Sequence, residues 1–307
     1  MTPTILPVTT HMNDPTAKND TPGMARVKAY YELTKPGIAG YVMITAGVSA
    51  FVGARGQLEL ALALNTMAGT GLATAGALTL NQYVERDVDA IMHRTRSRPL
   101  PTKRVTPMEA LGFGSMLLMG GLVYIALAVG TLPALLTVAS ALMYHAVYTP
   151  LKSRSYVATL AGSVPGALPM LIGWTAATGV IDRGGLALFA IGYLWQLPHV
   201  LGLAWMLRDD YARVGFKLIP TGGARSIGFQ MIAATGLLIP VSWAPGIIGL
   251  TDGPYLVGAT LLGLVFLGAA LAAARKMTEQ NARRVFFASL LYHPLLLGLM
   301  LLSTIRL

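Results

Sequence analysis

Residues 81–101 read NQYVERDVDAIMHRTRSRPLP and follow directly on a long apolar segment. Asn81, Glu85 and Asp89 are spaced four residues apart, so on an α-helix their side chains lie in one stripe. Three oxygen-bearing side chains on one face suit Mg²⁺, which prefers oxygen ligands and often shares them with substrate phosphates. The alternative is an acidic helix end that is solvated at a membrane border, and the arginines that follow favour the metal site.

A basic run comes immediately after these acids. It contains Arg94, Arg96, Arg98, Lys103 and Arg104. Guanidinium groups match the geometry of phosphate oxygens, so acids followed by arginines can hold magnesium together with a diphosphate. A basic loop beside a membrane segment also has a purely topological explanation, which stays open for most of these residues.

The composition is that of a helical membrane protein. Of 307 residues, 54% are hydrophobic and 12% are charged, against about 25% charged in a soluble domain. Apolar runs such as LLGLVFLGAALAAA at 261–274 do not alternate, which disfavours a transmembrane β-barrel. The absence of cysteine excludes disulfides and thiolate metal sites. The net charge of +10 is spread over short loops between apolar runs, which argues against nucleic-acid binding.

Apolar segments of about 20 residues, long enough to cross a bilayer, recur along the chain. Nine are expected, near residues 38–54, 59–84, 109–130, 134–148, 157–178, 185–207, 226–250, 255–274 and 285–304. The sequence therefore predicts an all-α polytopic membrane protein. Residues 33–307 are expected to form a single transmembrane domain, and residues 1–32, whose N-terminal part lacks the apolar core of a signal peptide, a disordered cytosolic tail.

Loop charges predict the orientation. With the N-terminus in the cytosol, all lysines and arginines except Arg55, Arg183 and Arg306 fall on the cytosolic side, as the positive-inside rule requires. Nine spans then put the C-terminus on the opposite side. The two long cytosolic connections, 85–108 and 208–225, both contain acids. We therefore expect the chemistry on the cytosolic face.

Other polar residues stand at the ends of spans. Asp209 and Asp210, in RDDYARVGFKLIP, could complete a second metal site facing the first. Lys35, in LTKPG, and Lys152, in VYTPLKSR, are cations at cytosolic span ends. Each of the four could instead be an ordinary interfacial or anchoring residue.

His199 lies inside the sixth expected span, in YLWQLPHVLGLAW. Pro198 should disturb the helix there and free a backbone carbonyl. An intramembrane histidine near Trp195 is a candidate ligand or proton carrier. A lone buried histidine is more often structural, so the sequence leaves both readings open.

Together these motifs resemble the UbiA superfamily of intramembrane prenyltransferases, and within it the protoheme IX farnesyltransferase (heme O synthase) branch. The resemblance extends from Leu33 to beyond Pro220. It rests on LTKPGI at 33–38, the run at 81–101, YTPLK at 148–152, PGALPMLIGW at 165–174, WQLPH at 195–199 and DDYARVG at 209–215. It implies nine transmembrane helices around a central cavity with cytosolic cap loops, in a bacterial inner membrane.

The sequence departs from the superfamily pattern at three points. The middle acid of the first motif is usually aspartate, and here it is Glu85. The second motif usually has two aspartates four apart, whereas Met206 and Val214 stand at that distance from Asp210. An asparagine that the pattern leads one to expect near Thr159 is absent. The lack of the second motif favours the heme branch over the quinone-precursor branch.

The resemblance implies transfer of the farnesyl group of farnesyl diphosphate to the vinyl side chain of heme b, giving heme O and diphosphate, with Mg²⁺ as cofactor. A heme A synthase or a terminal oxidase would be an assembly partner. On residues and resemblance together, we predict that Asn81, Glu85, Asp89 and Asp210 are catalytic metal ligands with Asp209 as a further ligand, that Lys35, Arg94, Arg98, Lys103 and Lys152 bind diphosphate, and that His199 and Trp195 contact heme.

Two other functions remain possible from the sequence. One is the same scaffold with another acceptor, such as 4-hydroxybenzoate or chlorophyllide. The other is a transporter of a small anion or of heme, because broken helices and intramembrane polar groups also suit transporters. Polar groups crowd one face of this chain, whereas a transport path needs them near the midplane, and this favours the enzyme.

Overall fold

The computed structural model describes residues 22–306, which are helical apart from turns, loops and one isolated β-bridge between Thr251 and Thr304. Of the tail expected over residues 1–32, residues 1–21 lie outside the described part. The remainder corrects the prediction, because residues 22–33 form a helix, α1, rather than irregular chain. Its residues Ala29 and Leu33 are buried against Leu100 and Val105, and this contact supplies the burial that orders the segment.

The helices follow one another with short connections. They are α1 (Pro22–Leu33), α2 (Pro36–Gly53), α3 (Leu60–Val84), α4 (Arg86–Ile91), α5 (Pro107–Ala128), α6 (Thr131–Leu142), the π-helix η1 (Met143–Tyr148), α7 (Thr149–Leu151), α8 (Val157–Thr178), α9 (Arg183–Met206), α10 (Arg208–Arg213), α11 (Gly223–Ile247), α12 (Gly253–Arg275) and α13 (Glu279–Ser303).

Within residues 22–306, eight segments are long and apolar enough to cross a membrane: α2, α5, the continuous segment Thr131–Leu151, α8, α9, α11, α12 and α13. Helix α3 is 25 residues long but does not belong to this set. It contains Asn65, several threonines and glycines, and Asn81 and Gln82 in its last turn, all of which lower its hydropathy. The all-α membrane fold is confirmed, and the count of nine spans stays a prediction.

Local sequence signals set the helix ends. Thr106 and Glu109 form a reciprocal capping box at the start of α5, which satisfies two backbone donors. Gly179, with φ of 73°, ends α8 in the left-handed conformation that glycine adopts without strain. Asp182 caps the next helix by accepting a hydrogen bond from the amide of Gly184 at 2.9 Å.

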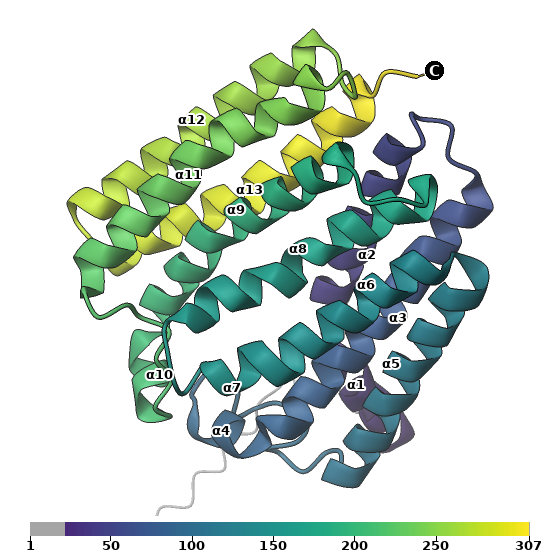
Figure 1. Cartoon of the computed structure of the whole chain (residues 1–307). Helices are drawn as coiled ribbons and strands as arrows, with labels where there is room; N and C mark the ends of the chain where they lie inside the picture. Colours follow the sequence, from purple (N-terminus) through teal and green to yellow (C-terminus); the bar gives the residue numbers. More distant parts are fainter. Residues whose placement is uncertain (1–21, 307) are drawn as a thin grey trace, which may run out of the picture.

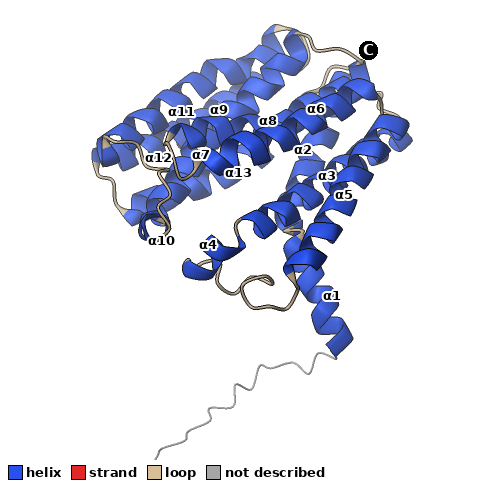
Figure 2. Ribbon diagram, turned by 60° about the horizontal axis from the view of Figure 1, so that its bottom comes forward, coloured by secondary structure: helices blue, strands red, loops and turns tan. Residues whose placement is uncertain are grey.

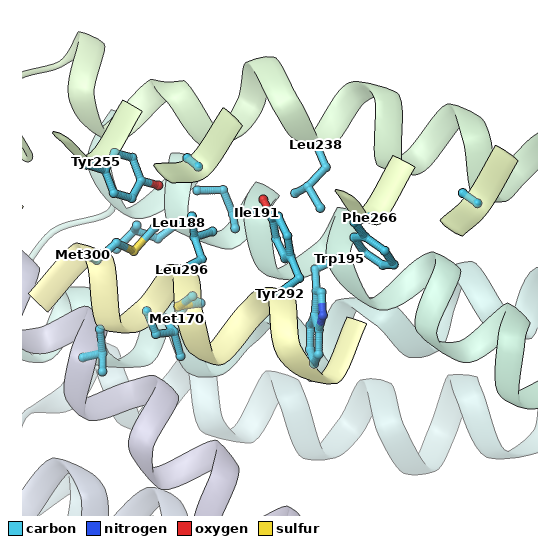
Figure 3. Packing of buried hydrophobic residues seen from close by; sticks show 14 of the residues in the cluster. Met170, Leu188, Ile191, Trp195, Leu238, Tyr255, Phe266, Tyr292, Leu296 and Met300 are labelled. Carbon is cyan, nitrogen blue, oxygen red and sulfur yellow. The ribbon is translucent and has the colours of Figure 1, made fainter. Parts of the chain in front are cut away.

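The bundle is arranged around α8 and α2 (Figure 1). Helices α9, α11, α12 and α13 pack together on one side, and α3 pairs with α5 on the other. The apolar core of the group formed by α9, α11, α12 and α13 includes Trp195, Tyr255, Phe266 and Tyr292 (Figure 3). On the other side, backbones approach closely: a Cβ on Gly76 would lie 2.3 Å from the backbone nitrogen of Leu118. Small residues at such contacts are typical of packed membrane helices.

One end of the bundle carries the short helices α4, α7 and α10, and the C-terminal residues lie at the other end (Figures 1 and 2). We call the first the cap end. Helix α1 also belongs to it, because the Gln82 side chain donates a hydrogen bond to the Leu33 carbonyl at 2.7 Å. The two acid-containing connections that the sequence singled out therefore meet at one end of the molecule.

Candidate active site at the cap end

A polar cavity of about 170 Å³ opens at the cap end. Residues from widely separated parts of the chain line it. Of the predicted site residues, Lys35, Asn81, Glu85, Asp89, Arg94, Arg98, Lys152 and Asp210 are in its wall. The predicted metal ligands and the predicted diphosphate ligands thus share one cavity.

The four-residue spacing of Asn81, Glu85 and Asp89 continues on one face across a break between two helices. Helix α3 ends at Val84 and α4 begins at Arg86, but the amide of Glu85 still donates to the Asn81 carbonyl at 2.9 Å, and the amide of Asp89 to the Glu85 carbonyl at 2.8 Å. The four-residue register therefore continues through the junction. All three side chains are buried, with Asp89 completely inaccessible.

Both carboxylates of the stripe are paired with cations. Lys152 Nζ lies 2.6 Å from Glu85 Oε1, and Arg98 Nη1 lies 2.6 Å from Asp89 Oδ2. Burial alone would lower the pKa of Lys152, but Tyr148 and Glu85 beside it hold that pKa above its ordinary value. A buried charge of this kind persists because it is compensated.

Lys35 is a cation in a different environment. Burial lowers the pKa of its ammonium group to about 7, and the positive charge of Arg98 acts in the same direction. The residue adopts φ of 45° and ψ of 63°, the left-handed conformation, directly before Pro36 at the start of α2. A non-glycine residue is strained there. Lys35 is therefore a buried amine in the wall of the polar cavity, on a strained backbone.

Asp210 joins the two cap connections. Its carboxylate accepts hydrogen bonds from the amides of His93 at 3.3 Å and Arg94 at 3.2 Å, and Arg213 Nη1 lies 3.4 Å away. Desolvation opposes ionisation, yet these amides and the nearby charges of His93 and Arg213 lower the pKa of Asp210. The carboxylate therefore connects α10 to the loop after α4 across the mouth of the cavity.

The oxygen donors of the cavity fit Mg²⁺. Asp89 Oδ1 is buried and has no hydrogen-bond partner, and such an orphaned anionic oxygen suits a cation. Residues 22–306 contain no cluster of three or more His, Asp or Glu side chains arranged around a metal position.

Four predicted site residues lie outside the wall of this cavity: Lys103, Asp209, His199 and Trp195. Lys103 is exposed in a turn with φ of 56°. The Asp209 side chain is 81% exposed beside Arg208. His199 and Trp195 pack between α9 and α13, where both bond to Ser289 at 2.8 and 2.7 Å. Contact of these two rings with heme stays a prediction.

A second, largely apolar cavity of about 270 Å³ adjoins the first. Residues of α2, α3, α5, α6, η1, α8 and α9 line it. Tyr144 and Tyr148 are in the walls of both cavities. Neither tyrosine was predicted from the sequence, although a signal was present: Tyr144, Tyr148 and Lys152 have the same four-residue spacing as Asn81, Glu85 and Asp89.

This arrangement can bind an ion pair of metal and diphosphate in the polar cavity and an apolar chain in its neighbour. The model of the UbiA prenyltransferase family matches residues 42–291. A protein named protoheme IX farnesyltransferase from Solibacter usitatus is 40% identical over 288 residues, covering 90% of this chain and 99% of that protein.

Two solved structures share the fold. One, described as digeranylgeranylglyceryl phosphate synthase in membranes, is 18% identical with a TM-score of 0.78, covering 92% of this chain and 100% of that one. The other is a UbiA homolog from Archaeoglobus fulgidus bound to GPP and Mg²⁺, 14% identical with a TM-score of 0.59, covering 89% of this chain and 99% of that one. The chain belongs to the UbiA prenyltransferase family, and within it to the protoheme IX farnesyltransferases.

Proposed function

We propose that this protein transfers the farnesyl group of farnesyl diphosphate to a vinyl side chain of heme b, giving heme O and diphosphate. The observation that carries the proposal is the junction of the two cavities. A polar cavity with four cations and three carboxylates in its wall adjoins an apolar cavity inside the bundle. A substrate with an anionic head and an isoprenoid tail has matching parts, and the relatives of 40% identity carry the name of this reaction.

In this proposal the cations of the polar cavity bind the diphosphate. Arg98 and Lys152 each approach a carboxylate at 2.6 Å and can turn toward phosphate oxygens when a metal ion takes over those carboxylates. Lys35 gains the anionic partner that favours its charged form. Positive groups fixed around a leaving group stabilise the charge that develops on it in the transition state.

Mg²⁺ would be held by Asp89 and Glu85, with Asn81 on the same stripe and Asp210 on the facing helix. Bound there, it would act as a Lewis acid that neutralises charge on the leaving diphosphate. Asn81 Nδ2 is buried without a partner and can donate to a phosphate oxygen. The protein's own contribution is to fix these donors before the substrate arrives.

The transfer breaks one carbon–oxygen bond of the substrate and forms one carbon–carbon bond to heme. The bond between the first farnesyl carbon and the diphosphate oxygen breaks, and its electron pair leaves with the diphosphate. The π electrons of the heme vinyl group form the new carbon–carbon bond, and water adds to the cation left on the porphyrin side and then loses a proton. The apolar wall of the second cavity, which includes Leu78, Leu118 and Ile172, keeps water away from the farnesyl carbon until that bond forms.

The membrane location is part of the proposal. With the cap end in the cytosol of a bacterial inner membrane, most arginines and lysines lie on the cytosolic side, and the diphosphate substrate meets the polar cavity from the water phase. Heme b would enter from the bilayer or its border. A heme A synthase or a terminal oxidase is a proposed partner for the product.

The test is direct. Membranes containing the protein are incubated with heme b, farnesyl diphosphate and Mg²⁺, and the extracted hemes are measured by mass spectrometry. The expected product is heme b with one farnesyl group and one hydroxyl group added across a vinyl side chain. Replacing heme b by 4-hydroxybenzoate or chlorophyllide is the control for acceptor choice. Prenylation of either of these with heme b unchanged would overturn the proposal.

A further inference from the structure

The wall that the two cavities share consists of Tyr144 and Tyr148. If a prenyl diphosphate occupies both cavities, its anionic head lies on one side of these rings and its chain on the other. The bond between the first chain carbon and the diphosphate oxygen is the boundary between head and chain. The bond that breaks therefore lies against the two tyrosines.

The backbone holds both rings at this boundary. Both belong to the π-helix Met143–Tyr148, a wide turn that is frequent at functional sites. The ring centroids are 5.5 Å apart with an angle of 30° between the planes. The Tyr144 hydroxyl donates to Asn81 Oδ1 at 3.2 Å, and a Cβ on Gly162 would lie 2.6 Å from the Tyr148 ring. The rings are thus fixed from two sides before a substrate binds.

Tyr148 already receives a cation on its ring, because Lys152 Nζ lies 4.5 Å from the ring centroid. Glu85 compensates the charge of that lysine at 2.6 Å. This contact demonstrates that a ring at the boundary can present its face to a positive charge. Because Lys152 Nζ already lies over the ring of Tyr148, the neighbouring ring of Tyr144 is the one left to face a second cation.

We propose that Tyr144, assisted by Tyr148, is a catalytic residue that stabilises the allylic cation of the farnesyl group through the face of its ring. This inference rests on the proposed function. When the carbon–oxygen bond breaks, the electron pair leaves with the diphosphate, and positive charge spreads over the first and third chain carbons. The electron-rich face of an aromatic ring attracts a cation within about 6 Å of its centroid. The attraction grows as the charge develops, so it raises kcat rather than substrate affinity.

The deciding experiment replaces Tyr144 by phenylalanine and by phenylalanines with one, two and three ring fluorines. These side chains have nearly the same shape, but each fluorine withdraws electrons from the ring face. We expect kcat for heme O formation to fall stepwise with each fluorine, to roughly one thirtieth at three fluorines. We expect KM for farnesyl diphosphate to stay within about twofold, because uniform binding is unchanged. A kcat that does not depend on fluorination overturns the proposal.

Tyr124 is the matched control. Its hydroxyl donates to Asn65 Oδ1 at 2.7 Å, so like Tyr144 it bonds to an asparagine of α3, but it is in the wall of neither cavity. The fluorinated series at Tyr124 should leave kcat unchanged. Equal slopes at the two positions would contradict the role of Tyr144. If the wild-type protein makes no heme O, the proposed function is wrong. If wild-type turnover is normal but kcat does not change with fluorination at position 144, only the role of Tyr144 is wrong.

Discussion

Lys152 Nζ lies 2.6 Å from Glu85 Oε1, and each side chain is only 9% exposed. Truncating one partner of such a buried pair leaves the other charge uncompensated, at a cost of about 3–5 kcal/mol. The pair therefore contributes to folding as well as to the site. The two contributions can be separated, because a neutral pair of similar volume removes both charges together.

We predict that Glu85→Gln and Lys152→Met each destabilise the protein, and that the double variant recovers most of the lost stability while turnover remains lost. The measurement is thermal unfolding in detergent alongside heme O formation. The single variants should unfold several degrees below wild type, with a favourable coupling in the double-mutant cycle. Additive stability losses would show that the pair does not act as a unit.

Lys35 offers a test of strain at the site. Its φ of 45° favours glycine by about 1–2 kcal/mol over other residues. We predict that Lys35→Gly is more stable than Lys35→Ala by about 1 kcal/mol in thermal unfolding, because glycine relieves the strain that alanine retains. Both variants should bind farnesyl diphosphate more weakly. Equal stability of the two would mean that the backbone relaxes when the lysine is absent.

The position of the acid stripe was predictable from sequence, because the four-residue spacing of Asn81, Glu85 and Asp89 depends only on helical geometry. The partners of these acids were not predictable. Adjacent residues on a helix point about 100° apart, so only one of Asp209 and Asp210 can face the cavity, and the sequence does not say which.

The positions of Lys103, Tyr144 and helix α1 were also not predictable from the sequence, because each depends on the folded chain. Lys103 follows the arginines closely in sequence, but a left-handed turn at φ of 56° leaves its side chain exposed. The boundary role of Tyr144 depends on how α6 and η1 pack against α8, which is a tertiary contact. Helix α1 was missed because its burial comes from Leu100 and Val105, residues distant in the chain, rather than from its own sequence.

The buried Asp89 and the exposed Asp209 should differ in their effect on the Mg²⁺ dependence of turnover. We predict that Asp89→Asn lowers turnover at least about 100-fold and raises the Mg²⁺ concentration for half-maximal activity, because it removes a buried ligand charge. Asp209→Asn is the control: its side chain is 81% exposed, and the variant should behave as wild type. The measurement is heme O formation across a Mg²⁺ titration after chelation. A wild-type Mg²⁺ profile for Asp89→Asn would show that Asp89 does not bind the metal ion.

Asp210 is predicted to hold the cap end closed through the amides of His93 and Arg94. Hydrogen exchange measures this directly. In Asp210→Ala the amides of residues 93 and 94 lose their acceptor, so they should exchange faster, while amides in the α11–α13 core keep wild-type rates. In wild type the protection should persist as pH falls, because the pKa of Asp210 is lowered. Its stabilising contribution is complete above the ordinary aspartate pKa and disappears only as pH passes through the lower folded-state value. Unchanged exchange at residues 93 and 94 in Asp210→Ala would show that other contacts close the cap.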